Sequence, residues 1–242
     1  MLADLAALFP DGMVHLGGDE VDTSCFDENP YIQTFMRQRH LTTYDQLVNL
    51  HMATVRAQLG SGKRALYWSN ADTFYQRYQP GDALVYWGDA VNITDMVRIY
   101  PEQAFVLAPV DHYYLDCSYG NPYGGTSWCD PMKTWWTIYQ FEVSDHIAST
   151  AALGAEVPVW SEIMNEDAVM QKAWPRAAAM GDKHWAPKVP TDLAAVTCRQ
   201  VHFRQYLNRR GLDATFISGR WCEELPEYCF GHYTPPKETF AE

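Results

Sequence analysis

The sequence predicts an α/β fold of the TIM-barrel, (β/α)8, class. Five short runs of residues are continuously apolar rather than alternating, which is typical of parallel strands covered on both faces. Each run finishes in an aromatic or acidic residue, and most are followed by a turn and by helical sequence. Polar and aromatic residues at the carboxyl ends of parallel strands are the arrangement of a barrel active site.

The first apolar run, residues 13–14, leads into the sequence His-Leu-Gly-Gly-Asp-Glu at residues 15–20. We expect a Gly-Gly turn here, because glycine reaches backbone angles that other residues avoid. The turn presents two adjacent carboxylates, Asp19 and Glu20. In a pocket, mutual repulsion and unequal burial would separate their pKa values, so that one holds a proton while the other stays ionised. A solvated, acid-rich turn is the alternative interpretation of these six residues.

Four further apolar runs end in the same way. They are residues 65–68, before Ser69-Asn70; 83–87, before Gly88-Asp89; 105–109, before Tyr113-Tyr114-Leu115-Asp116; and 157–160, before Ser161-Glu162. Helices are expected at residues 2–8, 31–39, 43–59, 72–78, 92–100, 167–185 and 191–210. Thr42 or Thr43 caps the third helix, Pro175 kinks or restarts the sixth, and Thr191 or Asp192 begins the last. Residues 117–133 are expected to form a long loop, and loops of that length are often functional.

The composition fits one globular domain and excludes several partners. The 242 residues are 47% hydrophobic and 14% aromatic, which suits an aromatic core, a carbohydrate site, or both. A formal net charge of −12 disfavours nucleic acid or an anionic membrane surface as partner. The sequence has no stretch of 18 apolar residues that predicts a transmembrane helix, and its first residues lack the basic start and apolar core of a signal peptide.

Taken in order, these strand ends resemble the β-N-acetylhexosaminidases of glycoside hydrolase family 20. The resemblance begins with the sequence at residues 15–20 and covers about residues 9–213. The later matching residues are Trp68, Trp87, Tyr114-Leu115-Asp116, Trp160-Ser161-Glu162 and Trp174-Pro175-Arg176-Ala177. The first motif is specific, and the ordered set is far more so.

The resemblance implies that the chain carries about strands four to eight of the barrel with their helices. Residues 1–230 would then be a partial catalytic (β/α) barrel, followed by a loose, proline-containing tail at residues 231–242. We therefore expect a carboxyl-terminal part of a longer protein, or a truncated gene model. The family also uses an Arg near strand one and an Asp–His pair near strand three, and no residue of this sequence matches either.

The activity implied by the resemblance is that of a retaining exo-glycosidase that releases terminal β-linked N-acetylhexosamine, GlcNAc or GalNAc, without a cofactor or metal. Enzymes of this family use the substrate's own 2-acetamido group as nucleophile. Glu20 would act as general acid and then base, Asp19 would orient the acetamido group, and Tyr114 would donate a hydrogen bond to its oxygen. The other implied residues are Trp68, Trp87 and Trp160 as pocket walls, Asp116 and Glu162 as acceptors from sugar hydroxyls, and His15 in a supporting role.

Six cysteines occur in the sequence, with neither a Cys-x-x-Cys pair nor a histidine cluster at metal spacing, so zinc is not expected. Cys117 and Cys129 bracket the long loop, and similar members of the family carry a comparable pair, which implies a disulfide. Cys222 could pair with Cys229 or with Cys198, and the sequence leaves this choice open.

Asn92 begins the glycosylation sequon Asn-Ile-Thr. With the cysteines, it favours an oxidising secretory route and therefore a lysosomal or secreted protein. The partner is expected to be a glycan, and a homodimer is one assembly open to the protein. Two other functions stay open: a non-catalytic sugar-binding remnant, or a two-carboxylate glycosidase in which Asp19 or Glu20 pairs with Glu162. Retaining carboxylate pairs lie about 5 Å apart.

Overall fold

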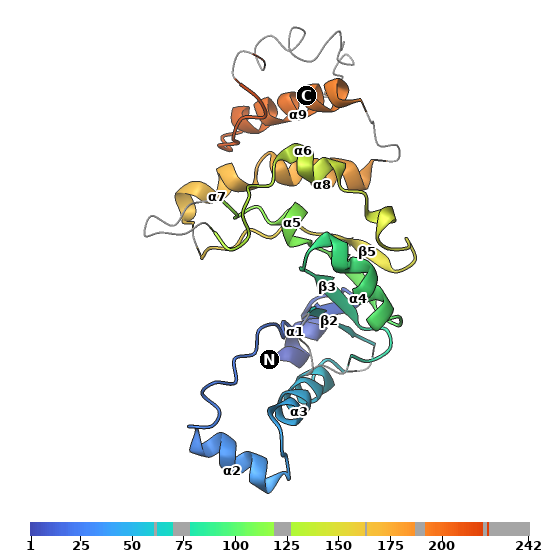
Figure 1. Ribbon diagram of the computed structural model, residues 1–242, viewed down its shortest axis with the longest axis vertical. Helices are drawn as coiled ribbons and strands as arrows, with labels where there is room; N and C mark the ends of the chain where they lie inside the picture. The colour runs from blue at the N-terminus through green and yellow to red at the C-terminus, as the bar shows by residue number, and fades with distance from the viewer. Residues whose placement is uncertain are drawn as a thin grey trace. The chain divides into compact units, whose positions relative to one another are not determined.

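The structure is a computed structural model that describes residues 1–60, 62–69, 78–118, 127–162, 164–186, 192–219 and 222. Its contacts divide the chain into two compact units (Figure 1). The first unit comprises Met1–Leu107 with Val143–Gly154. The second comprises Ala108–Glu142 with the residues from Ala155 onward.

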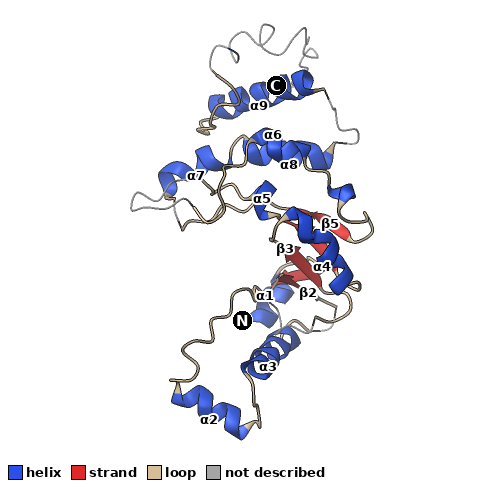
Figure 2. Cartoon of the chain, viewed as in Figure 1, coloured by secondary structure: helices blue, strands red, loops and turns tan. Residues whose placement is uncertain are grey.

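The first unit is built on a five-stranded sheet in which the order of the strands in space is their order in the chain. The strands are β1 (Met13–His15), β2 (Arg64–Trp68), β3 (Ala83–Tyr86), β4 (Ala104–Leu107) and β5 (Ala152–Ala155), as Figure 2 shows in red. Strands β1 to β4 pair in parallel. The N–H of Phe105 in β4 donates to the carbonyl of Ala151 at 2.7 Å, which continues the sheet toward β5. The expected parallel sheet is therefore confirmed.

The centre of the sheet explains the continuous apolar runs. All four residues of β3, Ala-Leu-Val-Tyr, are buried. A strand covered on both faces has no solvent side, so its sequence shows no alternation of polar and apolar residues. The edge strand β1 contrasts with it, because its three residues are half-buried or exposed.

Two of the four described helices of the first unit begin at side-chain caps. The helices are α1 (Leu2–Leu8), α2 (Pro30–Gln38), α3 (Tyr44–Ala57) and α4 (Ile93–Ile99), with the short 3-10 turns η1 (Ala90–Asn92) and η2 (Val143–Asp145). The Asn29 side chain accepts hydrogen bonds from two backbone N–H groups at the start of α2. Thr43 and Gln46 form a reciprocal capping box at the start of α3, so of the two caps that the sequence left open, Thr42 and Thr43, the structure uses Thr43.

A buried carboxylate fastens helix α3 to the sheet. The Asp82 side chain is fully buried and accepts two hydrogen bonds from the Arg56 guanidinium, at 2.6 and 3.2 Å. It also accepts the N–H of Ala65 in β2 at 3.2 Å and the N–H of Gln79 at 2.8 Å. Charge-assisted, bidentate contacts of this kind are the strong ones among side-chain hydrogen bonds. Asp82 thus joins a helix, a strand and a turn.

The second unit is helical where it has regular structure among its described residues. Its helices are α5 (Val110–Tyr113), α6 (Trp135–Gln140), α7 (Glu166–Ala173), α8 (Arg176–Trp185) and α9 (Leu193–Arg209). Pro175 separates α7 from α8, so the expected restart is confirmed. The Asp192 side chain accepts from the N–H of Ala194 and caps α9. Tyr113 is fully buried, and its hydroxyl oxygen lies 2.8 Å from Nε2 of His184. This hydrogen bond joins α5 to α8.

One predicted strand is wrong. Residues 157–160 form no strand, and the fifth strand of the sheet lies earlier, at β5. The carbonyl of Pro158 accepts the N–H of Leu115 at 2.9 Å, but Pro158 has no N–H with which to continue a ladder. The sequence Ala-Leu-Gly-Ala of β5 was missed because alanine and glycine have low strand preference.

Several expectations lie outside the described residues. They are most of the helix at 72–78, the middle of the loop at 117–133, Thr191 as a cap, the pairing of Cys229, and the tail at 231–242. Within the described part of the chain, every helix is too short or too polar to cross a membrane.

We predict that Asp82→Ala lowers the free energy of unfolding by about 3–5 kcal/mol, because removing one partner of a buried ion pair leaves the other groups unpaired. Asp95→Ala is the matched control. Asp95 forms an exposed pair with Arg98 on α4, and such pairs contribute about 0–1 kcal/mol. Urea unfolding of both variants measures the difference, and equal midpoints for the two would contradict a role of Asp82 in joining α3 to the sheet.

Candidate functional site

Hydrogen bonds in the first unit bring together the carboxyl ends of β1, β2 and β3. The N–H of Trp68 donates to the carbonyl of Gly17 at 3.2 Å, which joins the ends of β1 and β2. The N–H of Ser69 donates to the carbonyl of Val85 at 2.7 Å, which joins β2 to β3. The Trp87 indole N–H closes the series by donating to the carbonyl of Ser69. Three of the predicted strand ends therefore form one continuous edge.

The turn after β1 uses backbone angles that explain its two glycines. Gly17 and Gly18 have φ angles of 70° and 96°. Glu20 follows with φ of 45°, a left-handed conformation that is uncommon for a residue with a side chain. Strained backbone of this kind is concentrated at functional sites, where the surroundings hold it in place. The direction of the Glu20 side chain is thus set by an unusual backbone conformation.

His15 orders the start of this turn. Its Nδ1 accepts the N–H of Gly17 at 3.0 Å, and its ring lies 5.1 Å from the ring of Trp68, centroid to centroid. Packing desolvates the imidazole and lowers the pKa of His15, while the charge of Asp19 acts in the opposite direction. A neutral imidazole with an unprotonated Nδ1 is the form this hydrogen bond requires. These contacts agree with the supporting role expected for His15.

The two acids of the turn are both exposed in the structure, whereas Trp68 and Trp87 are half-buried. The unequal burial expected of Asp19 and Glu20 is not seen among the described residues, since both side chains are exposed. The edge formed by the three strand ends carries this turn together with Trp68 and Trp87.

The other predicted site residues lie in the second unit. The backbone of Leu115 is bonded to Pro158, and the carboxylate of Asp116 accepts the N–H of Trp160. The segments that contain Tyr114 and Trp160 are therefore adjacent. Tyr114 and Asp116 are buried, while Trp160 and Glu162 are exposed.

Asp116 has an unusual environment for a carboxylate. It is 1% exposed, and its Oδ1 has no hydrogen-bond partner among the described residues. Burial raises the pKa of Asp116, while hydrogen bonds from backbone N–H groups and the positive charges of Lys172 and Arg176 act to lower it. A buried acceptor oxygen without a protein donor is suited to accept a hydrogen bond from a ligand hydroxyl.

Trp128 is a neighbour of this site that the sequence analysis did not single out. Its ring meets the Tyr114 ring edge-on, with centroids 5.7 Å apart and an interplanar angle of 83°. The indole is 62% exposed, and an exposed aromatic beside a buried tyrosine is a common feature of ligand sites. The sequence feature that could have indicated Trp128 is its position directly before Cys129 in the long loop.

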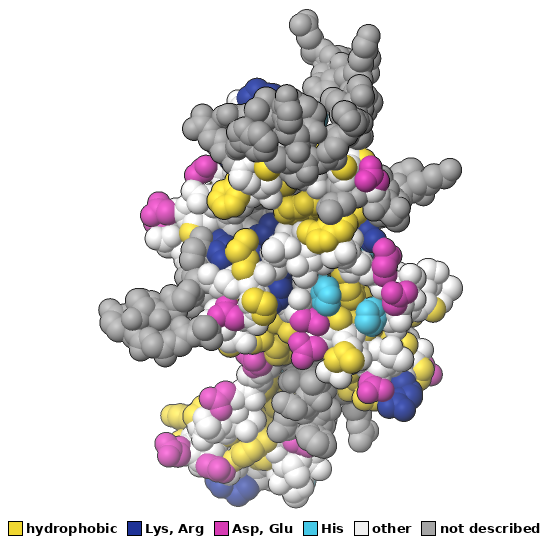
Figure 3. All heavy atoms as spheres, turned by 45° about the horizontal axis from the view of Figure 1, so that its top comes forward, with side chains coloured by type: hydrophobic (Ala, Val, Ile, Leu, Met, Phe, Trp, Pro, Cys, Tyr) yellow, Lys and Arg dark blue, Asp and Glu magenta, His cyan; other side chains and the backbone are white. Residues whose placement is uncertain are grey.

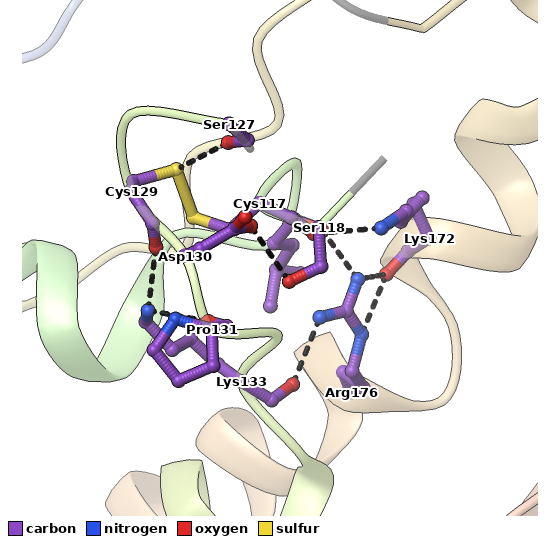
Figure 4. The surroundings of a disulfide bond; sticks show 10 residues. Cys117, Ser118, Ser127, Cys129, Asp130, Pro131, Lys133, Lys172 and Arg176 are labelled. Carbon is purple, nitrogen blue, oxygen red and sulfur yellow. Dashed lines mark hydrogen bonds between the residues drawn. A yellow bond between two sulfur atoms is a disulfide. The ribbon is translucent and has the colours of Figure 1, made fainter. Parts of the chain in front are cut away.

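The expected disulfide between Cys117 and Cys129 is confirmed, with Cα atoms 5.4 Å apart (Figure 4). Asp116 lies close to both sulfur atoms, but sulfurs joined in a disulfide are not the thiolate ligands that a metal site needs. Cys222 is also disulfide-bonded. The alternative pairing through Cys198 is wrong, because Cys198 is a buried free thiol.

The surface agrees with the acidic composition. Figure 3 shows acidic side chains spread over the face in view, with basic ones among them. Asn92, the predicted glycosylation site, is exposed at the end of η1. The hydroxyl of Thr94 in the same sequon donates to the carbonyl of His146 at 3.1 Å. Glycosylation of Asn92 stays a prediction.

A family model described as glycosyl hydrolase family 20, catalytic domain, matches residues 1–188 of the chain. The chain belongs to glycosyl hydrolase family 20. Among its curated relatives, beta-hexosaminidase 1 of Coccidioides posadasii is 28% identical over an alignment of 267 positions, which covers 95% of this chain and 44% of that protein. Beta-hexosaminidase subunit alpha of Rattus norvegicus is 28% identical over 232 residues, 93% of this chain and 42% of the relative. This family 20 chain thus spans less than half the length of these relatives.

Solved family 20 structures show the same fold. The exo-β-N-acetylglucosaminidase of Vibrio harveyi, in complex with N-acetylglucosamine, matches with a TM-score of 0.73 at 24% identity, over 89% of this chain and 35% of that chain. Another β-N-acetylhexosaminidase matches with a TM-score of 0.70 at 20% identity, over 86% of this chain and 45% of that chain. The family and the TIM-barrel class predicted from the sequence are therefore confirmed, with a five-stranded part of the fold in this family 20 chain.

We predict that Cys129→Ala lowers the free energy of unfolding by about 2–4 kcal/mol, because the disulfide no longer restricts the unfolded chain. Cys25→Ala is the matched control, since Cys25 is a free and exposed thiol. Thermal unfolding of both variants in the absence of reductant measures the effect. Non-reducing peptide mapping that found Cys117 and Cys129 as free thiols in secreted protein would contradict the assignment.

Proposed function

We propose that the protein carrying this chain is a retaining exo-β-N-acetylhexosaminidase that releases terminal GlcNAc or GalNAc by substrate-assisted catalysis. The observation that carries the proposal is the edge formed by three strand ends in the first unit. There an acidic pair follows two glycines in a left-handed turn, on the same edge as Trp68 and Trp87. Membership of family 20 supports the same chemistry, because enzymes of that family use the 2-acetamido group as nucleophile.

In this mechanism the acetamido oxygen attacks the anomeric carbon while the glycosidic C–O bond breaks. Glu20 gives its proton to the leaving oxygen and then takes a proton from water, which attacks the anomeric carbon and opens the oxazolinium ring. Asp19 orients the acetamido group and faces the positive charge that develops on its nitrogen. The left-handed backbone at Glu20 supports the assignment, since it fixes the direction from which a proton would be delivered.

In this proposal, the residues after β4 that the family resemblance singles out bind the sugar. The Tyr114 hydroxyl donates to the acetamido oxygen, and the indole of Trp160 stacks on the pyranose. Asp116 and Glu162 accept hydrogen bonds from sugar hydroxyls, which are stronger when the acceptor is ionised. The buried Oδ1 of Asp116, without a partner among the described residues, supports this role.

The proposed setting is the lysosome or the extracellular space. The disulfide between Cys117 and Cys129 and the exposed sequon at Asn92 support a secretory route. A terminal N-acetylhexosamine of a glycan is the proposed partner. The relatives from Rattus norvegicus and Felis catus are described as alpha and beta subunits of beta-hexosaminidase, which supports a dimer as the assembly to test.

Glu20→Gln in the full-length protein should lower kcat for substrates with poor leaving groups by about 10²–10⁴-fold, since proton transfer to the leaving oxygen is lost. Aryl N-acetylglucosaminides with good leaving groups should suffer less, because they depart without a proton. Steady-state kinetics across a series of leaving groups checks this, with Glu28→Gln in the adjoining loop as control. A rate that Glu20→Gln leaves unchanged would remove Glu20 from the mechanism.

The acetamido group should be required: a plain β-glucoside should be almost inert although its other hydroxyls are available. Asp19→Asn should lower kcat by about 10²–10³-fold with a smaller change in KM, because its charge matters chiefly as the oxazolinium forms. A thiazoline analogue of that ring should inhibit the wild type strongly. Covalent labelling of Asp19 or Glu162 by a fluorosugar would instead establish the two-carboxylate mechanism. Binding of N-acetylglucosamine without turnover would establish the sugar-binding remnant.

A further inference from the structure

Three buried cations surround the disulfide of the second unit. Lys133, Lys172 and Arg176 are 3%, 6% and 2% exposed. In Figure 4, Lys172 and Arg176 reach toward the backbone beside Cys117, and Lys133 reaches toward the backbone beside Cys129. Lysine and arginine are almost never buried to this extent unless specific interactions compensate for their lost hydration. Such a group of cations therefore calls for a physical reason.

Two of these cations hold the backbone on either side of Asp116. The Arg176 guanidinium donates to the carbonyl of Leu115, directly before Asp116. The Lys172 ammonium donates to the carbonyl of Cys117, directly after it, at 2.7 Å. Arg176 also donates to the carbonyl of Lys172, at 2.6 Å and 3.0 Å, which links the two cations to each other. The segment that carries Asp116 is thus fixed at both neighbouring peptide groups.

The third cation extends this arrangement to the other half of the disulfide. Lys133 donates to the carbonyls of Cys129 and Pro131 at 2.7 and 2.6 Å. Its own carbonyl accepts a hydrogen bond from Arg176 at 2.8 Å. Arg176 therefore donates to the backbone both before the disulfide loop, at Leu115, and after it, at Lys133.

Backbone carbonyls accept hydrogen bonds from all three cations but carry no net charge. Burial raises the pKa of Asp116, and the positive charges of Lys172 and Arg176 act in the opposite direction. Apolar side chains could fill the same volume at a smaller desolvation cost, since a buried ion pair is often no more stabilising than its hydrophobic replacement. The charge is thus better explained by what it does to Asp116 than by stability.

We propose that Lys172 and Arg176 are positioning residues that hold the segment Tyr114–Cys117 in place and set two positive charges beside the Asp116 carboxylate, the acceptor for a hydroxyl of the bound sugar. The proposal rests on the sugar-binding role of Asp116 proposed above. Neither cation needs to touch the substrate. Both act through the geometry of the two peptide groups beside Asp116 and through the field at its carboxylate.

The sign of the pH effect follows from the charges around this carboxylate. Lys172 on α7 and Arg176 on α8 favour the ionised form, and Lys133 lies on the same network. Asp130, whose carboxylate accepts the Ser118 hydroxyl at 2.9 Å, is the negative charge that acts on Lys172. Burial and Arg176 lower the pKa of Lys172 to about 8, so this lysine is charged in acidic solution. Removing its charge should raise the pKa of Asp116.

The test uses Lys172→Gln, which keeps a hydrogen-bond donor and removes the charge, and Lys172→Arg, which keeps both. The readout is kcat/KM against pH for an aryl N-acetylglucosaminide, in the full-length protein. For Lys172→Gln, the acidic limb should move upward by on the order of one pH unit, with activity recovering at higher pH. Lys172→Arg should restore the wild-type profile. A loss of activity that is equal at every pH in Lys172→Gln would overturn the proposal.

Lys183→Gln is the matched control. Lys183 is a buried cation of the same unit, but it pairs with Glu142. It should lower thermal stability without moving the acidic limb. An equal shift from Lys183→Gln would show that the profile reports general destabilisation and would also overturn the proposal.

A second measurement does not depend on turnover. The carboxyl carbon of Asp116, labelled with ¹³C and assigned by comparison with Asp116→Asn, is titrated by NMR in the wild type and in Lys172→Gln. The proposal expects a higher midpoint in the variant, and an unchanged midpoint contradicts it. A wild-type protein that is inactive on the acetamido substrate would refute the proposed function, while the NMR result would still decide whether Lys172 controls the charge of Asp116.

Discussion

Parallel pairing of β1, β2 and β3 is the constraint on which the first unit depends. The register sets Met13 against Arg64 and Leu66 against Ala83, and the strands then end in step. Because they end in step, the carbonyl of Gly17 meets the N–H of Trp68 rather than water. A slip of one residue would turn every side chain of a strand to the other face. The position of the acidic turn is therefore a consequence of backbone hydrogen bonds some residues before it.

Much of this could be predicted from the sequence, because the signals are local. Continuous apolar runs marked four of the five strands, and the pair Thr42-Thr43 marked the start of α3. The prediction failed at residues 157–160, where an apolar run looked like a strand. Its partners are the backbone of Leu115 and the carboxylate of Asp116, which lie far away in the sequence and follow a helix. Local pattern shows that a segment is extended, whereas the identity of its partner depends on the fold.

The buried cations could not be found from the sequence at all. Lysine and arginine are mostly exposed, so Lys133, Lys172 and Arg176 carried no sign of burial, and only the family motif drew attention to Arg176 as a structural residue. Their positions follow from the chain reversal at the disulfide and from the restart of the helix at Pro175, which place donors from two helices against the same backbone. Such convergence is a property of tertiary structure.

The acidic groups of the two units are in opposite environments. Asp116 is buried, and the fixed charges of Lys172 and Arg176 act against the cost of its burial before any ligand arrives. Such preorganisation makes an acceptor effective without rearrangement. Asp19 and Glu20 are exposed, so water screens their charges until something displaces it. If the proposed function holds, the sugar itself must provide that displacement, since binding would desolvate the acids beside Trp68 and strengthen every interaction they make. Recognition in this protein would then be built into the fold, whereas the reactivity of the acidic pair would arise only in the complex.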